Sequence, residues 1–128
     1  MTRPLHVFGR TLYEDGSLTP SEFAVFRQSA EFLRRTVPLI PTCVVFVDAD
    51  VTTALMRVDN RGRGEERGVT AAYLEQLKDA EYKWYHHQTN DIPHRIYLDG
   101  EGTAEEIFAE LMTHRSQLES VMTDPLFV

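Results

Sequence analysis

The chain has 128 residues, of which 42% are hydrophobic and 26% are charged, a composition typical of one soluble globular domain. Its formal net charge of −7 argues against a general nucleic-acid surface, because binding to phosphate backbones depends on basic patches. No apolar run approaches the ~20 residues that a membrane helix needs, and the N-terminus lacks the apolar core of a secretory signal. We therefore expect no membrane partner and a cytoplasmic location, with the mitochondrion as the alternative.

The first quarter of the chain predicts two helices. The spacing of Leu5, Phe8 and Leu12 predicts a short helix from about Pro4 to Glu14. The second helix begins at Thr19-Pro20-Ser21-Glu22, which combines a threonine cap, a proline in the first helical position and a glutamate three residues after the cap. It is expected to run to about Arg35.

Apolar residues of this second helix form two stripes. Phe23, Phe26, Ala30 and Leu33 make one stripe, and Val25 and Phe32 make the other. The second stripe either packs inside the protein or meets a partner subunit, and the pattern alone favours neither.

Two segments predict parallel strands. Residues Thr42–Asp48 read TCVVFVD, which is apolar without alternation, as in a parallel strand that is covered on both faces. The second strand is His94–Asp99. Between them we expect a helix from Val51 to about Asn60, capped by Asp50, and a helix from Thr70 to about His86-His87.

A last helix follows the second strand. Thr103-Ala104-Glu105-Glu106 is another capping box, and the helix that it begins carries Ile107, Phe108, Leu111, Leu118 and Val121. The whole pattern, about two strands and five helices in one domain over residues 1–128, is typical of an α/β fold with a parallel sheet. Two parallel strands cannot cover their own faces and edges, so we expect the isolated chain to be poorly soluble or oligomeric.

Charge is concentrated in the loop that joins the two middle helices, which reads RVDNRGRGEERGV over residues 57–69. Arg57 and Arg61 are one helical turn apart, and Arg63 lies just beyond them. Guanidinium groups suit phosphate oxygens, both as paired donors and as permanent charges. A solvated loop whose charges pair with each other is the common explanation of such a run. The glycines, the grouping of the arginines and the place after a parallel strand and its helix favour a lid over a phosphate-bearing ligand.

Histidines offer a weaker hypothesis. His86 and His87 are adjacent, so they point in different directions from a helix, and with His94 they form no recognisable ligand spacing. We therefore predict no metal site in this chain.

The segment RGRGEERGVTAAYLEQL, Arg61–Leu77, closely resembles the lid and following helix of the deoxyribonucleoside kinases, the group that includes deoxycytidine, deoxyguanosine and mitochondrial thymidine kinases. The similarity extends from Val7-Phe8 through VVFVDAD to Leu98-Asp99. It implies a P-loop-kinase-like α/β fold with a parallel sheet and flanking helices. It also implies, for the complete enzyme, transfer of the γ-phosphoryl group of ATP, with Mg²⁺, to the 5′-hydroxyl of a deoxynucleoside.

The resemblance also implies roles for individual residues. By position in the family, Arg57, Arg61 and Arg63 are lid arginines that contact the phosphoryl donor and stabilise the transferring group. Glu66 corresponds to the residue that binds the 3′-hydroxyl of the deoxyribose, and Phe8 to the aromatic residue that stacks on the nucleobase.

The resemblance also bears on the partner subunit and on the preferred base of the substrate. The family uses the helix over residues 19–35 in its dimer interface, which favours a homodimer. The position that reads the base edge falls at Pro4, or at Arg3 with a one-residue shift, so the preferred base stays open. The loop that contacts adenine in the family is replaced here by Gly100-Glu101-Gly102.

Several parts of the family's active site are absent from these 128 residues. There is no G-x-x-x-x-G-K-[ST] loop, no Glu-Arg-Ser segment, and no early acidic residue to take the proton of the 5′-hydroxyl. We therefore expect the chain to be the C-terminal portion of such a kinase, inactive alone and binding neither ATP nor Mg²⁺ securely by itself. The alternatives are a non-catalytic protein that binds a full-length kinase subunit and an incomplete gene model.

Overall fold

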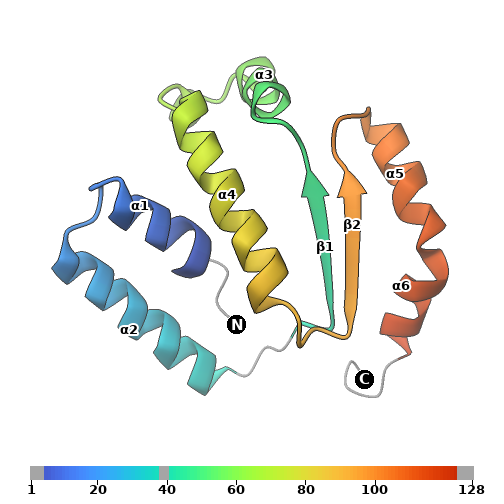
Figure 1. The fold of residues 1–128 in the computed structure, drawn as a ribbon, viewed down its shortest axis with the longest axis horizontal. Coiled ribbons are helices and arrows are strands. Elements are labelled where there is room, and N and C mark those ends of the chain that lie inside the picture. The colour runs from blue at the N-terminus through green and yellow to red at the C-terminus, as the bar shows by residue number, and fades with distance from the viewer. Residues whose placement is uncertain (1–4, 38–40, 124–128) are drawn as a thin grey trace. The chain divides into compact units, whose positions relative to one another are not determined.

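The computed structural model describes residues 5–37 and 41–123 (Figure 1). In chain order the elements are η1 (Leu5–Gly9), α1 (Arg10–Glu14), α2 (Pro20–Thr36), β1 (Cys43–Asp48), α3 (Val51–Arg61), η2 (Gly64–Glu66), α4 (Ala71–Gln88), β2 (His94–Asp99), α5 (Ala104–Thr113) and α6 (Arg115–Met122). Residues of the chain group into two compact units, each with most of its contacts within itself. The first unit is Met1–Ile40 with Glu75–Thr89, and the second unit is Pro41–Leu74 with Asn90–Val128.

The second unit is built on a two-stranded parallel sheet, which confirms the predicted α/β class. β1 and β2 pair in register from Cys43 opposite His94 to Asp48 opposite Asp99, and Figure 1 shows both arrows pointing the same way. α5 packs on β2, where Ile96 and Leu98 are fully buried. The strand bounds predicted from the sequence are therefore correct to one residue.

β1 is covered less than the sequence predicts. Val45 and Val47 lie opposite the fully buried Ile96 and Leu98, yet they are 42% and 49% exposed. The prediction of a strand covered on both faces is wrong for the described residues, because α5 packs on β2 while Val45 and Val47 of β1 stay partly in solvent.

The first unit contains η1, α1, α2 and most of α4. The predicted helix from about Pro4 is observed as η1 followed by α1, although Pro4 itself lies outside the described residues. η1 packs closely on α2, because a β-carbon at Gly9 would lie 2.4 Å from the Phe26 ring. Side chains buried in this unit are Val7, Thr11, Trp84, Tyr85 and Thr89.

Two helices begin with the predicted capping boxes. At the start of α2 the Glu22 backbone N–H donates to the Thr19 hydroxyl over 3.3 Å, and the Thr19 N–H donates to the Glu22 carboxylate over 2.8 Å. Thr103 and Glu106 form the same pair of bonds at the start of α5. Each box gives partners to donors that the first turn of a helix would otherwise leave without one.

The predicted last helix is two helices. The His114 N–H donates to the Leu111 carbonyl over 3.0 Å, a bond to the third residue back instead of the fourth, so α5 ends and α6 starts again at Arg115. The sequence therefore undercounts the α-helices, because Leu118 and Val121 continue the apolar spacing across this break.

The capping box of α2 gives a first prediction. Thr19→Ala removes the hydroxyl, which accepts from the Glu22 N–H and donates to the Glu22 carboxylate over 2.7 Å, so we expect the free energy of unfolding to fall by about 1 kcal/mol, measured by urea titration and circular dichroism. Ser21→Ala, at an exposed position in the same turn, serves as the control and should leave stability within about 0.5 kcal/mol.

The box should also add a pH dependence. The backbone N–H and then the hydroxyl of Thr19 hold the pKa of Glu22 below its usual value. Its stabilisation is therefore present above the ordinary carboxyl pKa and lost as the pH falls through the lowered pKa of the folded state. Equal acid sensitivity in the parent and in Glu22→Gln would contradict this assignment.

Candidate functional site

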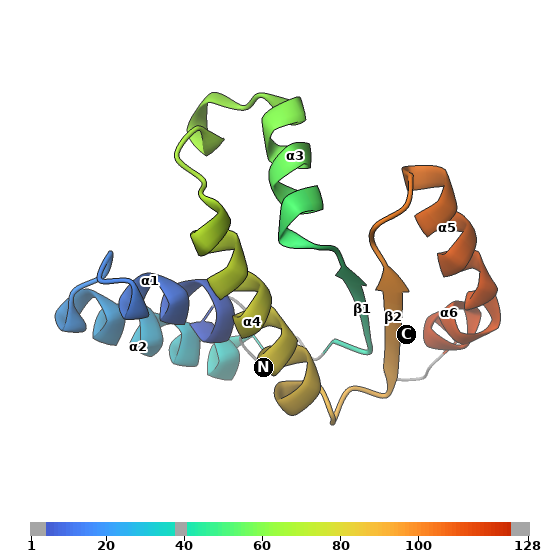
Figure 2. The ribbon, with the colours of Figure 1, turned by 45° about the horizontal axis from the view of Figure 1, so that its top comes forward.

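The predicted lid, residues 57–69, runs from the last turns of α3 through η2 to the start of α4. α3 ends at Arg61, and Gly62 follows in the left-handed region with φ of +62°, where glycine is favoured. α4 begins where the Tyr73 N–H donates to the Thr70 hydroxyl over 3.2 Å, as the sequence predicts. Figure 2 shows α3 continuing from β1 and leading into this loop.

Two of the predicted arginines meet the predicted glutamate. Arg61 donates to Glu66 through Nε over 3.0 Å and through Nη2 over 2.8 Å, a bidentate pair. Arg63 Nη1 lies 3.8 Å from the same carboxylate. The side chain of Arg61 is 47% exposed and that of Glu66 is 21% exposed. Exposed ion pairs contribute ~0–1 kcal/mol, so Arg61 can exchange Glu66 for another anion at small cost.

The third predicted arginine has a different partner. Arg57 Nη2 donates to the carbonyl of Gly102 over 2.9 Å, in the loop that follows β2. The structure thus groups Arg61, Arg63 and Glu66, while Arg57 contacts the loop at the end of the sheet.

Phe8 belongs to η1 in the first unit, where it is 37% exposed. Arg3 and Pro4, the candidates for reading the base edge, lie outside the described residues.

Sequence reasoning missed the role of the loop Gly100–Gly102. The Glu101 carboxylate accepts from the backbone N–H of Asp50 and, over 2.6 Å, from the Thr53 hydroxyl at the start of α3. Among the described residues Asp50 holds the predicted N-cap position, but its side chain makes no capping hydrogen bond to α3. Glu101 provides the carboxylate at this helix start instead. Because Glu101 is distant from Asp50 in the chain, no local sequence pattern predicts this contact.

Gly100 explains why this loop lies so close to β1. Its N–H donates to the Asp48 carbonyl over 2.6 Å, and a β-carbon at this position would lie 2.7 Å from the same oxygen. Only glycine fits here without a shift of the backbone. The close approach places Glu101 within reach of α3.

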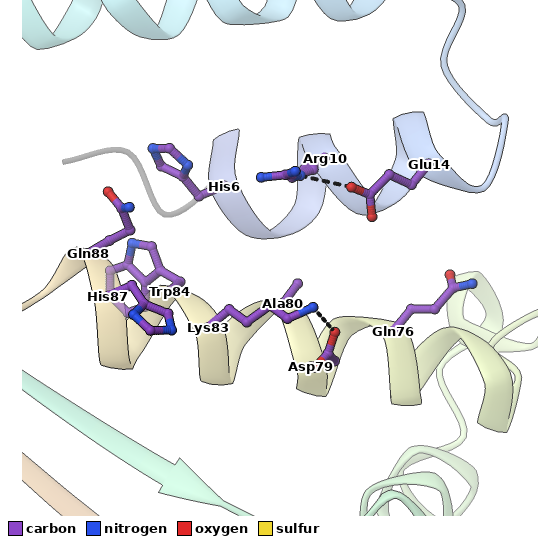
Figure 3. A pocket seen from close by; sticks show the side chains of 10 residues that line it. All are labelled: His6, Arg10, Glu14, Gln76, Asp79, Ala80, Lys83, Trp84, His87 and Gln88. Atoms are coloured by element: carbon purple, nitrogen blue, oxygen red, sulfur yellow. Dashed lines mark hydrogen bonds and ion pairs between the residues drawn. The ribbon is translucent and has the colours of Figure 1, made fainter.

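A separate cavity of about 370 Å³ lies in the first unit between η1–α1 and α4 (Figure 3). Its wall carries the ion pairs Arg10–Glu14 and Lys83–Asp79, over 2.8 Å and 2.6 Å. Burial, and then the charge of Arg10, lower the pKa of His6. The indole Nε1 of Trp84 is buried and has no hydrogen-bond partner among the described residues. Since the charged groups are already paired, the cavity does not resemble a phosphate site.

Metal-binding clusters and membrane-spanning helices are absent from the residues that the structure describes. Those residues contain no group of three or more His, Cys, Asp or Glu side chains that could hold a metal ion. His86 packs against the rings of Tyr82 and Tyr85 instead, with centroids 4.1 Å and 5.2 Å away. None of the described helices is long and apolar enough to cross a membrane.

The two-stranded parallel sheet and its flanking helices define an α/β protein. A family model described as deoxynucleoside kinase matches residues 3–123. The chain therefore belongs to the deoxynucleoside kinase family, and it corresponds to the C-terminal part of these proteins.

Curated relatives agree with this family. Deoxyguanosine kinase of Bacillus subtilis (strain 168) is 26% identical over 72 residues, which are 56% of this chain and 34% of the relative. Human deoxycytidine kinase is 27% identical over 86 residues, 66% of this chain and 33% of the relative. The chain thus spans about a third of the length of the curated relatives that it matches.

Solved structures agree on the fold. Deoxyadenosine kinase from M. mycoides with bound dATP superposes with a TM-score of 0.69 at 20% identity, over 88% of this chain and 56% of that one. The same enzyme with bound dCTP gives a TM-score of 0.70 over 89% of this chain and 58% of that one, also at 20% identity.

The Arg61–Glu66 pair gives a second prediction. Glu66→Gln removes the charge that holds both arginines, so the backbone amides of residues 62–69 should exchange hydrogen faster, while the free energy of unfolding changes by less than about 1 kcal/mol. Mass spectrometry of exchanged peptides measures this. Glu65→Gln removes the same charge from the exposed neighbouring residue and should leave exchange unchanged. Equal effects of the two variants would contradict a specific role for Glu66.

Proposed function

We propose that this chain supplies the lid of an ATP-dependent deoxynucleoside kinase, whose complete active site phosphorylates the 5′-hydroxyl of a deoxynucleoside. The observation that carries the proposal is the pairing of Arg61 and Arg63 with one carboxylate, Glu66, in the loop between α3 and α4 of a chain from this family. M. mycoides deoxyadenosine kinase, which shares the fold, has been solved with dATP bound and with the product dCMP.

The chemistry assigned to the lid is charge stabilisation during phosphoryl transfer. The bond between the γ-phosphorus and its bridging oxygen breaks, a bond to the 5′-oxygen forms, and the 5′-hydroxyl proton goes to a base outside this chain. Arg61 and Arg63 donate to the oxygens of the transferring group, where negative charge is spread in the transition state. When Arg61 leaves Glu66, the carboxylate is released to accept a hydrogen bond from the 3′-hydroxyl.

The proposal also gives roles to Arg57 and Phe8. Arg57 is assigned to the donor side because it already contacts the loop after β2. Phe8 is assigned to stacking on the base from its family position alone. The described residues offer no cluster of metal ligands, so the Mg²⁺ used by the complete enzyme is assigned no ligand in this chain.

The proposal also assigns a second polypeptide segment to the active site. The 128 residues lack a phosphate-binding loop, and the chain covers about a third of its curated relatives. The partly exposed Val45 and Val47 on β1 are the surface that such a segment would cover with a further strand and its helix. A strand added to β1 would complete the sheet and bring the phosphate-binding loop to its carboxyl end.

A third prediction concerns activity. The 128-residue chain with ATP, Mg²⁺ and each of the four deoxynucleosides should show no turnover above background, because the phosphate cradle and the general base are both missing. A fusion to the phosphate-loop half of a related kinase should phosphorylate at least one deoxynucleoside. Turnover by the 128-residue chain alone, or a soluble fusion with no activity, would contradict the proposal.

The same fusion separates the lid arginine from its neighbours. Arg61→Ala should lower kcat by about 10²- to 10³-fold, as expected on removal of one donor to a charged transition state. Arg67→Ala, an exposed arginine in the same loop, should leave kcat within about twofold.

We further propose that α2 forms a homodimer interface. None of the residues of α2, all of which are described, is buried, and Val25 and Phe32 are 63% and 65% exposed. An apolar stripe of this kind is characteristic of a surface that another protein covers. Arg34, and then Arg35, hold the pKa of Glu31 at about 2, so this carboxylate stays charged beside the stripe at every physiological pH.

A fourth prediction tests this interface. Phe32→Glu should weaken self-association at least tenfold, because it places a charge in the apolar stripe, as measured by light scattering during size exclusion. Arg67→Gln changes the net charge by the same amount at an exposed position outside α2 and should leave association unchanged. A parent chain that is monomeric at all concentrations would refute the interface.

A further inference from the structure

The loop between β2 and α5 is joined to the connection between β1 and α3 at three points. The bonds run from the Gly100 N–H to the Asp48 carbonyl over 2.6 Å, from the Asp50 N–H and the Thr53 hydroxyl to the Glu101 carboxylate, and from Arg57 to the Gly102 carbonyl over 2.9 Å. Gly100 is therefore bonded to the end of β1, while Glu101 and Gly102 are bonded to the first two turns of α3 and to its N-cap residue.

Glu101 is the charged member of this set. Its two carboxylate oxygens accept from Asp50 and Thr53, so the carboxylate spans the first turn of α3. Hydrogen bonds to a charged acceptor are stronger than those between neutral groups, and a negative charge at a helix N-terminus is favourable. The Asp50 side chain makes no capping bond to α3 in the described structure, and the Glu101 carboxylate lies at this helix start.

Both ends of the loop are fixed, so Glu101 does not simply follow α3. On one side Gly100 lies against the Asp48 carbonyl, where a β-carbon would come within 2.7 Å. The Glu101 N–H donates to Asp99 Oδ1 over 2.9 Å. On the other side the Thr103–Glu106 capping box starts α5. Glu101 therefore links α3 to the strand ends and to α5.

Because α3 is long, a small change of its angle at the first turn, where Glu101 binds, moves the residues at its far end, where the proposed lid begins. An 11-residue helix is roughly 16 Å long, so a tilt of about 10° at its first turn moves its far end by roughly 3 Å. Arg61, which begins the lid, lies at that far end. Displacements of about 1 Å at a reacting centre can lower rates about 100-fold.

We infer that Glu101 is a positioning residue, which sets the direction of α3 and thereby the place of Arg57 and Arg61 over the phosphates. The inference rests on the proposed kinase function of the lid. It assigns the loop Gly100–Gly102 to holding α3, which is a different task from contacting the base of the phosphoryl donor.

The first test needs no activity and uses the 128-residue chain. In Glu101→Ala the amides of residues 50–54 should exchange hydrogen about tenfold faster, because charged hydrogen bonds of this kind are lost. Thr53→Val removes only one of the two bonds and keeps the shape of the side chain, so it should give a smaller increase. Glu105→Ala removes a nearby exposed carboxylate and should leave these amides unchanged. Unchanged exchange in Glu101→Ala would overturn the inference, whatever the activity of the kinase.

The second test uses the fusion to a phosphate-loop half. Glu101→Ala should lower kcat at least tenfold with little change in the KM for the deoxynucleoside, and Glu101→Gln, which keeps one acceptor oxygen, should recover part of the loss. Faster exchange at the start of α3 with an unchanged kcat would show a local structural bond only and would overturn the positioning role. An inactive but folded parent fusion would refute the proposed function and the positioning role together. The hydrogen-exchange result would still show whether Glu101 holds the start of α3.

Discussion

The parallel pairing of β1 with β2 is the constraint on which the second unit depends. Because Asp48 lies opposite Asp99, the two strands end level, and α3 and the loop Gly100–Gly102 start side by side. A slip of one residue would turn every strand side chain to the other face and would separate Glu101 from the start of α3. The register therefore places Ile96 and Leu98 on the same face of β2 and brings the loop Gly100–Gly102 to the start of α3.

The arginines of the loop over residues 57–69 make exposed contacts. Arg61 is held by two hydrogen bonds to Glu66, and Arg57 by one to a carbonyl. Contacts of this kind order a loop without fixing it, since an exposed pair contributes ~0–1 kcal/mol. At the other end of α3, Glu101 accepts hydrogen bonds from the Asp50 N–H and the Thr53 hydroxyl, and Gly100 lies against the Asp48 carbonyl.

The partly exposed face of β1 and the apolar stripe of α2 have the same physical origin. In both, apolar side chains are exposed to solvent in the described part of the chain: Val45 and Val47 on β1, and Phe32 on α2. Such surfaces are stabilised when another segment covers them. The chain belongs to the deoxynucleoside kinase family and spans about a third of the length of its curated relatives.

The sequence by itself determined the features that depend on residues within about one helical turn of each other. The capping boxes at Thr19 and Thr103 were predictable because the paired residues lie three apart in the chain, and the two strands were predictable from their own apolar residues. The pairing of Arg61 and Arg63 with Glu66 matches the alternative of a loop whose charges pair with each other. The break at His114 was hidden, because apolar spacing continues through it. Only the tertiary structure decided that Glu101, and not the Asp50 side chain, binds the start of α3, and that Arg57 contacts Gly102. These pairs are far apart in sequence, and they meet because strand register brings two chain ends to the same edge of the sheet.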